Sequence, residues 1–179
     1  YDGYVPPSIF EVEGARDVAL EFHSMSKTYN MTGWRCGWAC GREELVHALA
    51  TVKSFIDTGS YLAIQAAAAA ALDVHDEFVP KNVAIFTERR DAAVAAFREN
   101  GFQCDVPKAA MYLWIPLPPH IPSKVFADKL MEQEGVVVLA GAAFGAGGEG
   151  FFRISFITSP ERIREAAKRA GRVLASFND

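Results

Sequence analysis

The chain has little cysteine or histidine, and neither residue is arranged as a disulfide framework or metal centre requires. The cysteines are odd in number and form no Cys-x-x-Cys pair, and the histidines are scattered without ligand spacing. We therefore expect no metal site and a reduced, cytoplasmic chain. The residues concerned are Cys36, Cys40, Cys104, His23, His47, His75 and His120.

Long apolar runs and basic runs are also missing. The apolar stretch at residues 61–72 is mostly alanine and is shorter than the roughly 20 residues that cross a bilayer. The net charge of −4 and the absence of clustered lysine or arginine argue against a nucleic-acid surface. Half of the residues are hydrophobic, which is typical of a globular protein, so we expect neither membrane nor nucleic acid as a partner.

An initiator methionine is absent too. The opening Tyr1-Asp2-Gly3-Tyr4 reads as an interior loop, which predicts that the chain is a piece of a longer protein. We expect two segments, with residues 1–75 as the end of a larger α/β domain and residues 76–179 as a small α+β domain.

Hydrophobic periodicity and capping residues predict the elements of both segments. Helices are expected at 43–55, at 61–72 with Ser60 as a cap, at 76–100, from Ser123 to about 134, and from Ser159 to about 177. Strands are expected at 18–22, 36–40, 102–105, 111–117, 136–139 and 151–156. The five glycines within 141–150 predict a mobile loop or a tight turn.

The most informative stretch is the polar loop at residues 24–38. It contains Ser24, Ser26, Lys27 and Arg35 between two apolar runs. A lysine amine can form an imine with an aldehyde, and serine and arginine are residue types that bind phosphate. Together they describe a seat for a cofactor with an aldehyde and a phosphate, which is pyridoxal 5′-phosphate (PLP).

Arg153 lies within the apolar run Phe151-Phe152-Arg153-Ile154-Ser155-Phe156. An arginine in such a run needs an anionic partner or an exit to solvent. The sequence alone leaves open a ligand anion, a buried salt bridge or an outward-pointing side chain.

The pattern Ser24-x-Ser26-Lys27, seven residues and Arg35-x-Gly37 resembles the cofactor segment of class I/II (fold-type I) aminotransferases. The resemblance implies that Lys27 is catalytic and binds the cofactor, and that Ser24 and Arg35 bind its phosphate. Ser26 is a further cofactor-binding candidate by proximity, with a structural role still open.

The segment Gly148-Glu149-Gly150-Phe151-Phe152-Arg153-Ile154-Ser155 is similar to the family's C-terminal segment, whose arginine binds the substrate α-carboxylate. Tyr112 and Trp114 fall in a strand that the family shares, where we expect plain core packing. Ala140-Gly141 departs from the Pro-Gly of many members, which puts the loop geometry in question.

The resemblance covers the C-terminal part of the family's fold. It implies an α/β fold, with residues 1–75 as the C-terminal remnant of the PLP-binding large domain and residues 76–179 as the small C-terminal domain. The residues that hold the pyridine ring in the family would precede Tyr1. The isolated piece is therefore expected to be inactive.

The function implied is a PLP-dependent aminotransferase of amino-acid metabolism, cytoplasmic and homodimeric when whole, acting on an amino acid and a 2-oxo acid. The sequence of residues 4–15 and 21–35 is most similar to that of LL-diaminopimelate aminotransferases and of alanine/aspartate aminotransferase relatives. Two alternatives remain open: a PLP-dependent β-lyase, and an aminotransferase-like ligand-sensing domain of a transcription regulator.

Overall fold

The structure, a computed structural model, describes residues 1–177 and divides into two compact units. One unit is Val5–Asn82, and the other joins Tyr1–Tyr4 to the chain from Val83 on. The boundary lies inside a helix, seven residues beyond the expected one at residue 75. In the part of the chain described, no helix is both long and apolar enough to cross a membrane.

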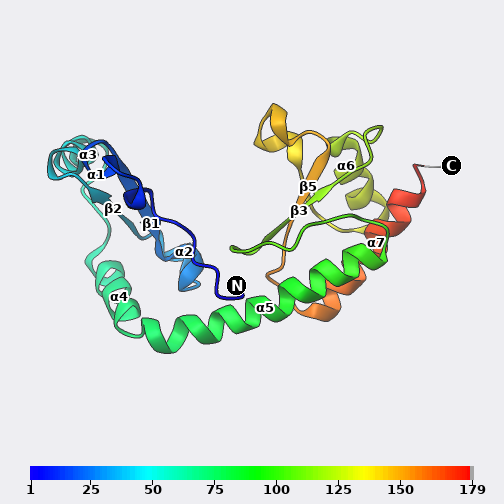
Figure 1. The fold of residues 1–179 in the computed structure, drawn as a ribbon, viewed down its shortest axis with the longest axis horizontal. Helices are drawn as coiled ribbons and strands as arrows, with labels where there is room; N and C mark the ends of the chain where they lie inside the picture. Colours follow the sequence, from blue (N-terminus) through cyan, green and yellow to red (C-terminus); the bar gives the residue numbers. More distant parts are fainter. Residues whose placement is uncertain (178–179) are drawn as a thin grey trace. The chain divides into compact units, whose positions relative to one another are not determined.

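The unit Val5–Asn82 is built on an antiparallel hairpin of two strands, β1 and β2, with Leu20 opposite Gly41 and Ser24 opposite Gly37 (Figure 1). The loop between the strands carries the short helix α2. The elements in order are η1 (Ile9–Glu11), α1 (Ala15–Val18), β1 (Leu20–Ser24), α2 (Met25–Thr28), η2 (Thr32–Trp34), β2 (Gly37–Gly41), α3 (Glu43–Ile56), α4 (Leu62–Asp73) and the start of α5 (His75–Glu99).

The buried core of this unit is small. It consists of Met25, Tyr29, Met31 and Ala68, so α2 and the chain after it pack against α4. Of the six consecutive alanines at residues 66–71 in α4, only Ala68 is buried. Ser60 was expected to cap α4, but the N-cap position is Tyr61 and no side chain caps the helix. The unit therefore leaves much of its apolar surface uncovered.

The second unit is an antiparallel three-stranded sheet in the order β3-β5-β4 with helices α5, α6 and α7. Its elements after α5 are β3 (Tyr112–Pro116), α6 (Ser123–Glu134), β4 (Leu139–Ala140), η3 (Gly141–Phe144), η4 (Ala146–Gly148), β5 (Phe151–Ser155) and α7 (Pro160–Ala175).

Aromatic side chains fill the core of the second unit. The rings of Phe126 and Phe152 lie 4.8 Å apart, and Phe102 meets Phe152 at 5.4 Å and Phe97 at 5.5 Å. Ring pairs at these separations stabilise a core beyond the area that they bury. This core fixes β5, and with it the strand position of Arg153.

The first four residues belong to this second unit. Arg90 is buried at 4% exposure, and its guanidinium forms ion pairs with Asp2 (2.6 Å) and Asp91 (2.7 Å). The hydrogen bond to Asp2 is the main cause that raises the pKa of Arg90. The positive charge of the buried Arg90 is therefore balanced by two carboxylates, as the burial of a charged group requires.

Candidate active site

The candidate residues near the N-terminus all lie on the loop of the β1–β2 hairpin. Ser24 ends β1 and is the N-cap of α2, where its Oγ accepts a hydrogen bond from the Ser26 amide (3.1 Å). Met25 next to it is fully buried and anchors the helix, while Lys27 is exposed. A serine cap followed by a buried methionine thus sets the lysine at the surface of the loop.

The far end of the loop is tied back to its start. The Thr32 hydroxyl donates to the Ser26 carbonyl (2.8 Å), and the Met25 amide donates to the Cys36 carbonyl (3.1 Å). Arg35 has left-handed backbone angles, φ 53° and ψ 48°, and its Nη1 donates to the Thr32 carbonyl (3.1 Å). The structure therefore brings Ser24, Ser26, Lys27 and Arg35 together on one closed loop.

Side chains at the start of α5 form hydrogen bonds with the loop and stabilise it. The Tyr29 hydroxyl and His75 Nδ1 lie 2.7 Å apart. Asn82, which is buried, accepts from the Asn30 amide group (3.1 Å) and donates to the Thr28 carbonyl (3.3 Å). These bonds hold the segment directly after Lys27, and sequence reasoning did not foresee them because their partners are about 50 residues apart.

The two cations of the loop have no acidic partner among the described residues. Within residues 1–177, neither Lys27 nor Arg35 forms an ion pair, and Lys27 Nζ has no hydrogen-bond partner. Ser24 Oγ accepts one bond and still has a proton to donate. An amine can react with an aldehyde, and a guanidinium and a hydroxyl can donate hydrogen bonds to a phosphate. The residues present therefore fit PLP.

Arg153 lies in the other unit, at the middle of β5, opposite Trp114 of β3 and Leu139 of β4. Its guanidinium lies over two aromatic rings, 4.2 Å from the centroid of Tyr112 and 4.3 Å from that of Phe144. No acidic side chain among the described residues pairs with it. The structure favours an uncommitted arginine over a buried salt bridge.

Aromatic side chains surround Arg153, and this arrangement was not predicted from the sequence. Trp114 stacks on Phe151 at 5.5 Å and meets Phe144 at 5.6 Å, and it is 37% exposed. The expectation of plain core packing is therefore wrong for Trp114. Buried and less buried residues alternate along β3, which places Tyr112 and Trp114 on its less buried face. The strand is apolar throughout, so no alternation in the sequence could have predicted this.

The loop before β5 is fastened to the start of α6. Glu149 accepts hydrogen bonds from the amide (2.7 Å) and hydroxyl (3.0 Å) of Ser123, and the Ala142 amide donates to the same hydroxyl (3.3 Å). The bond from the Ser123 amide is the main cause that lowers the pKa of Glu149. The backbones of Gly141 and Gly148 also approach closely, and a Cβ on Gly141 would overlap the Gly148 carbonyl oxygen.

Fold and site together define a fold-type I transferase fragment, in which a lysine loop and an arginine strand belong to separate units. The sequence model described as aminotransferase class I and II matches residues 1–169, and the chain belongs to that family.

Individual relatives agree with this assignment. LL-diaminopimelate aminotransferase of Moorella thermoacetica is 45% identical over 174 residues, which are 97% of this chain and 45% of the relative. The LL-diaminopimelate aminotransferase of Dehalococcoides mccartyi strain CBDB1 is 45% identical over 172 residues, 96% of this chain and 44% of its own length.

Solved structures resemble the chain over nearly its full length. Apo-BacF of Bacillus subtilis has a TM-score of 0.89 and 34% identity, covering 95% of this chain and 44% of that one. An aromatic aminotransferase from Pyrococcus horikoshii has a TM-score of 0.88 and 30% identity, covering 99% of this chain and 48% of that one. The chain therefore spans somewhat less than half the length of these relatives.

Proposed function

We propose that the whole protein to which this chain belongs is a PLP-dependent aminotransferase that moves an amino group between an amino acid and a 2-oxo acid. One observation carries the proposal: Lys27 is exposed on a closed loop beside Ser24 and Arg35, without an ion pair in residues 1–177. A lysine amine must be free of such partners to react with a carbonyl compound.

Ser24, Lys27 and Arg35 are the residues that would hold the cofactor, with Ser26 beside them. A guanidinium can donate two parallel hydrogen bonds to phosphate oxygens, and the Ser24 hydroxyl supplies a third donor. When bound, PLP supplies an aldehyde that takes up the amino group and a ring that withdraws electrons from the substrate Cα.

Arg153 and Lys27 act on the substrate itself. The Arg153 guanidinium binds the α-carboxylate through paired N–H groups. Cation–π contacts with Tyr112 and Phe144 hold the guanidinium itself in place. Holding the carboxylate orients the substrate for reaction. For Lys27 we propose the role of general base, whose amine removes the proton from the substrate Cα. Amino acid and 2-oxo acid share the carboxylate, so Arg153 serves both directions.

Substrate, assembly and compartment are part of the same proposal. The names of the relatives support LL-diaminopimelate as the first amino acid to test, with alanine and aspartate for comparison. We propose a homodimer in the cytoplasm. Because the chain covers less than half of its relatives, we expect the isolated piece to be inactive.

Covalent trapping tests the central residue. In the whole protein loaded with PLP, borohydride reduction should fix the cofactor onto Lys27, and peptide mapping identifies the labelled lysine. Lys27→Ala should take up no label and should lose turnover. Lys53 is an exposed lysine on α3, and Lys53→Ala, as the matched control, should leave both labelling and turnover unchanged.

Label on another lysine, or none, would refute the role of Lys27. Trapping on Lys27 with release of pyruvate and ammonia in the absence of a 2-oxo acid acceptor would instead identify a β-lyase.

A further inference from the structure

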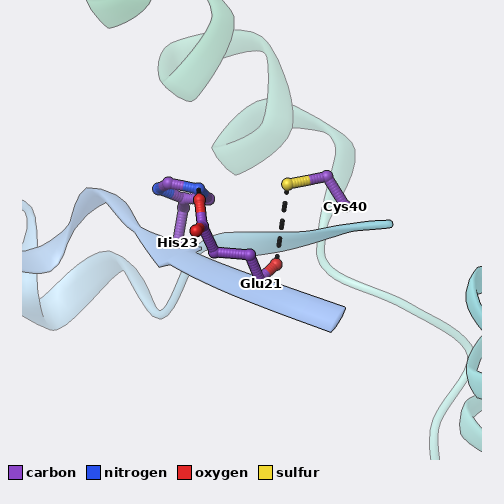
Figure 2. A group of neighbouring side chains, drawn as sticks. All are labelled: Glu21, His23 and Cys40. Atoms are coloured by element: carbon purple, nitrogen blue, oxygen red, sulfur yellow. Dashed lines mark hydrogen bonds and ion pairs between the residues drawn. The ribbon is translucent and has the colours of Figure 1, made fainter. Parts of the chain in front are cut away.

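Three side chains with metal-binding atoms meet on one face of the β1–β2 hairpin, on strands that flank the Lys27 loop. Glu21 and His23 are two residues apart on β1, so they share a face, and Cys40 lies directly opposite Glu21 on β2. One ligand atom from each lies within 4.8 Å of the others (Figure 2). All three belong to the unit Val5–Asn82.

The Glu21 carboxylate is oriented by groups outside the cluster. Its Oε2 accepts hydrogen bonds from the Ser8 hydroxyl (2.6 Å) and the Ile9 amide (3.0 Å). The bond from Ser8 is the main cause that lowers the pKa of Glu21, so the group is charged at neutral pH. Its Oε1 is turned the other way, toward His23 Nε2 at 2.7 Å.

The His23 ring is held as well. It stacks on Trp38, its cross-strand partner, with ring centroids 5.1 Å apart and 12° between the planes. Metal ligands in proteins are usually oriented by such outer contacts, and the loss of one typically weakens binding by about 10- to 100-fold. Two of the three side chains here already have that support.

Cys40 completes the donor set. It is a free, half-buried thiol whose Sγ lies 3.6 Å from the Glu21 carbonyl oxygen, at the weak end of sulfur hydrogen bonds. Imidazole, thiolate and carboxylate are the ligand types of Zn²⁺, which bonds to them at about 2.0–2.3 Å. Ligand atoms at a tetrahedral zinc ion are then roughly 3–4 Å apart, which small side-chain rotations would reach from the observed spacing.

We propose that Glu21, His23 and Cys40 form a binding site for a divalent transition-metal ion of the Zn²⁺ type, with the fourth position open to water. The Cys40 thiol gives up its proton to solvent when the ion binds. His23 and Glu21 keep 42% and 21% of their side chains exposed, which leaves the ion a path of entry. The proposal does not depend on the aminotransferase assignment.

Zinc retention and cobalt spectroscopy test the site in the untagged whole protein to which this chain belongs. After loading and dialysis, the protein should keep one Zn²⁺ at this site, and Co²⁺ in its place should give a sulfur-to-cobalt absorption band. Cys40→Ser and His23→Gln should lose stoichiometric retention, and Cys40→Ser should also lose the band. Cys36→Ser and His47→Gln are matched controls outside the cluster and should behave like the parent chain.

Alkylation of the unmodified whole protein gives a readout that does not require a variant to fold. Zn²⁺ should slow the reaction of Cys40 with iodoacetamide, a chelator should restore it, and the rate at Cys36 should not change. No retained zinc in the parent chain, equal retention in all variants, or a Cys40 rate that ignores zinc would each overturn the proposal.

Discussion

At the scale of single residues, Arg35 combines a costly backbone conformation with a side chain that forms no ion pair among residues 1–177. Left-handed angles at a residue other than glycine cost of the order of 1 kcal/mol. A glycine at position 35 would relieve this cost but would remove the guanidinium. An arginine in this conformation is expected where its guanidinium has a function that glycine could not provide.

Substitutions at Arg35 can separate the two effects in the whole protein. Arg35→Ala and Arg35→Gly should both weaken PLP binding by about 10- to 100-fold, because a charge-assisted fork to phosphate is lost. Arg35→Gly should unfold at a higher denaturant concentration than Arg35→Ala, since glycine accepts φ of 53°. PLP titration and equilibrium denaturation measure the two quantities. Unchanged PLP affinity in both variants would contradict the phosphate role.

The sequence predicted that the candidate residues of the cofactor loop lie together, but it did not predict what surrounds them. Lys27, Ser24 and Arg35 are close in the chain, so their common loop could be read from the sequence. The cluster of Glu21 with His23 and Cys40 was missed because histidine spacing was judged along the chain. The expected strand at 18–22 stops one residue short of His23, whereas β1 runs from Leu20 to Ser24 and puts residues 21 and 23 on one face.

At the scale of elements, the segment of residues 141–150 determines how β5 begins. It was expected to be mobile or tightly turned, and it forms two 3₁₀ turns held by Glu149 and by the contact of Gly141 with Gly148. At Gly141 and Gly148 the absence of a side chain is required, because backbone atoms fill the space where a Cβ would lie.

Alanine substitutions measure that requirement. Gly141→Ala should destabilise the chain by at least the roughly 1–3 kcal/mol that forced overpacking costs, because its Cβ would meet backbone and not a movable side chain. Gly147→Ala is the matched control, since nothing lies within 4 Å of its Cβ position. Denaturant unfolding of the two variants gives the difference. Equal stabilities would show that the segment is looser than described.

The Glu149 contact predicts a pH dependence. Its pKa is lowered in the folded state, so the carboxylate stabilises the fold above the ordinary glutamate value of about 4.3, and this contribution disappears as pH falls through the lowered value. Glu149→Gln should therefore be less stable than the parent chain at pH 7, and the gap should close in acid.

Unfolding midpoints measured from neutral to acidic pH test this expectation. Glu132→Gln on α6 is the control, because Glu132 is exposed and makes no hydrogen bond or ion pair among residues 1–177. A gap between Glu149→Gln and the parent that is constant with pH would exclude ionisation of Glu149 as its cause.

Helices were more predictable than strands. The expected helices at 43–55, 123–134 and 159–177 correspond to α3, α6 and α7, because capping and periodicity are local signals. The expected strand at 102–105 is wrong, and that at 136–139 forms only over Leu139–Ala140. A strand needs a partner at the right place, which β-branched residues do not reveal.

At the scale of the whole molecule, the two units differ in how much of themselves they bury. Among residues 1–177, the core of the second unit has 19 buried residues, whereas the core of Val5–Asn82 has four. Helix α3 has no buried residue, and Phe55 and Ile56 at its end are 88% and 76% exposed. Apolar surface of this extent favours association, so we expect the isolated chain to self-associate.

Hydrogen exchange should report the same difference. In the isolated chain, amides of β3, β5, α6 and α7 should exchange most slowly. Amides of β1, β2 and α3 should exchange much faster, because local opening exposes them without unfolding of the whole chain. Mass spectrometry of peptides from each unit makes the comparison, with the same chain tested for transamination. Equal protection in both units together with turnover would contradict the view that the chain is only part of an enzyme.

The ion pair between Asp2 and Arg90 bears on where the chain can be cut for expression. The second unit is discontinuous in sequence, so a clone that starts at Val83 would contain its helices and sheet but not Asp2. Arg90 would then have Asp91 as its remaining acidic partner among the described residues. A trimmed fragment that keeps this unit intact would need Tyr1–Tyr4 supplied through a short artificial connection to Val83.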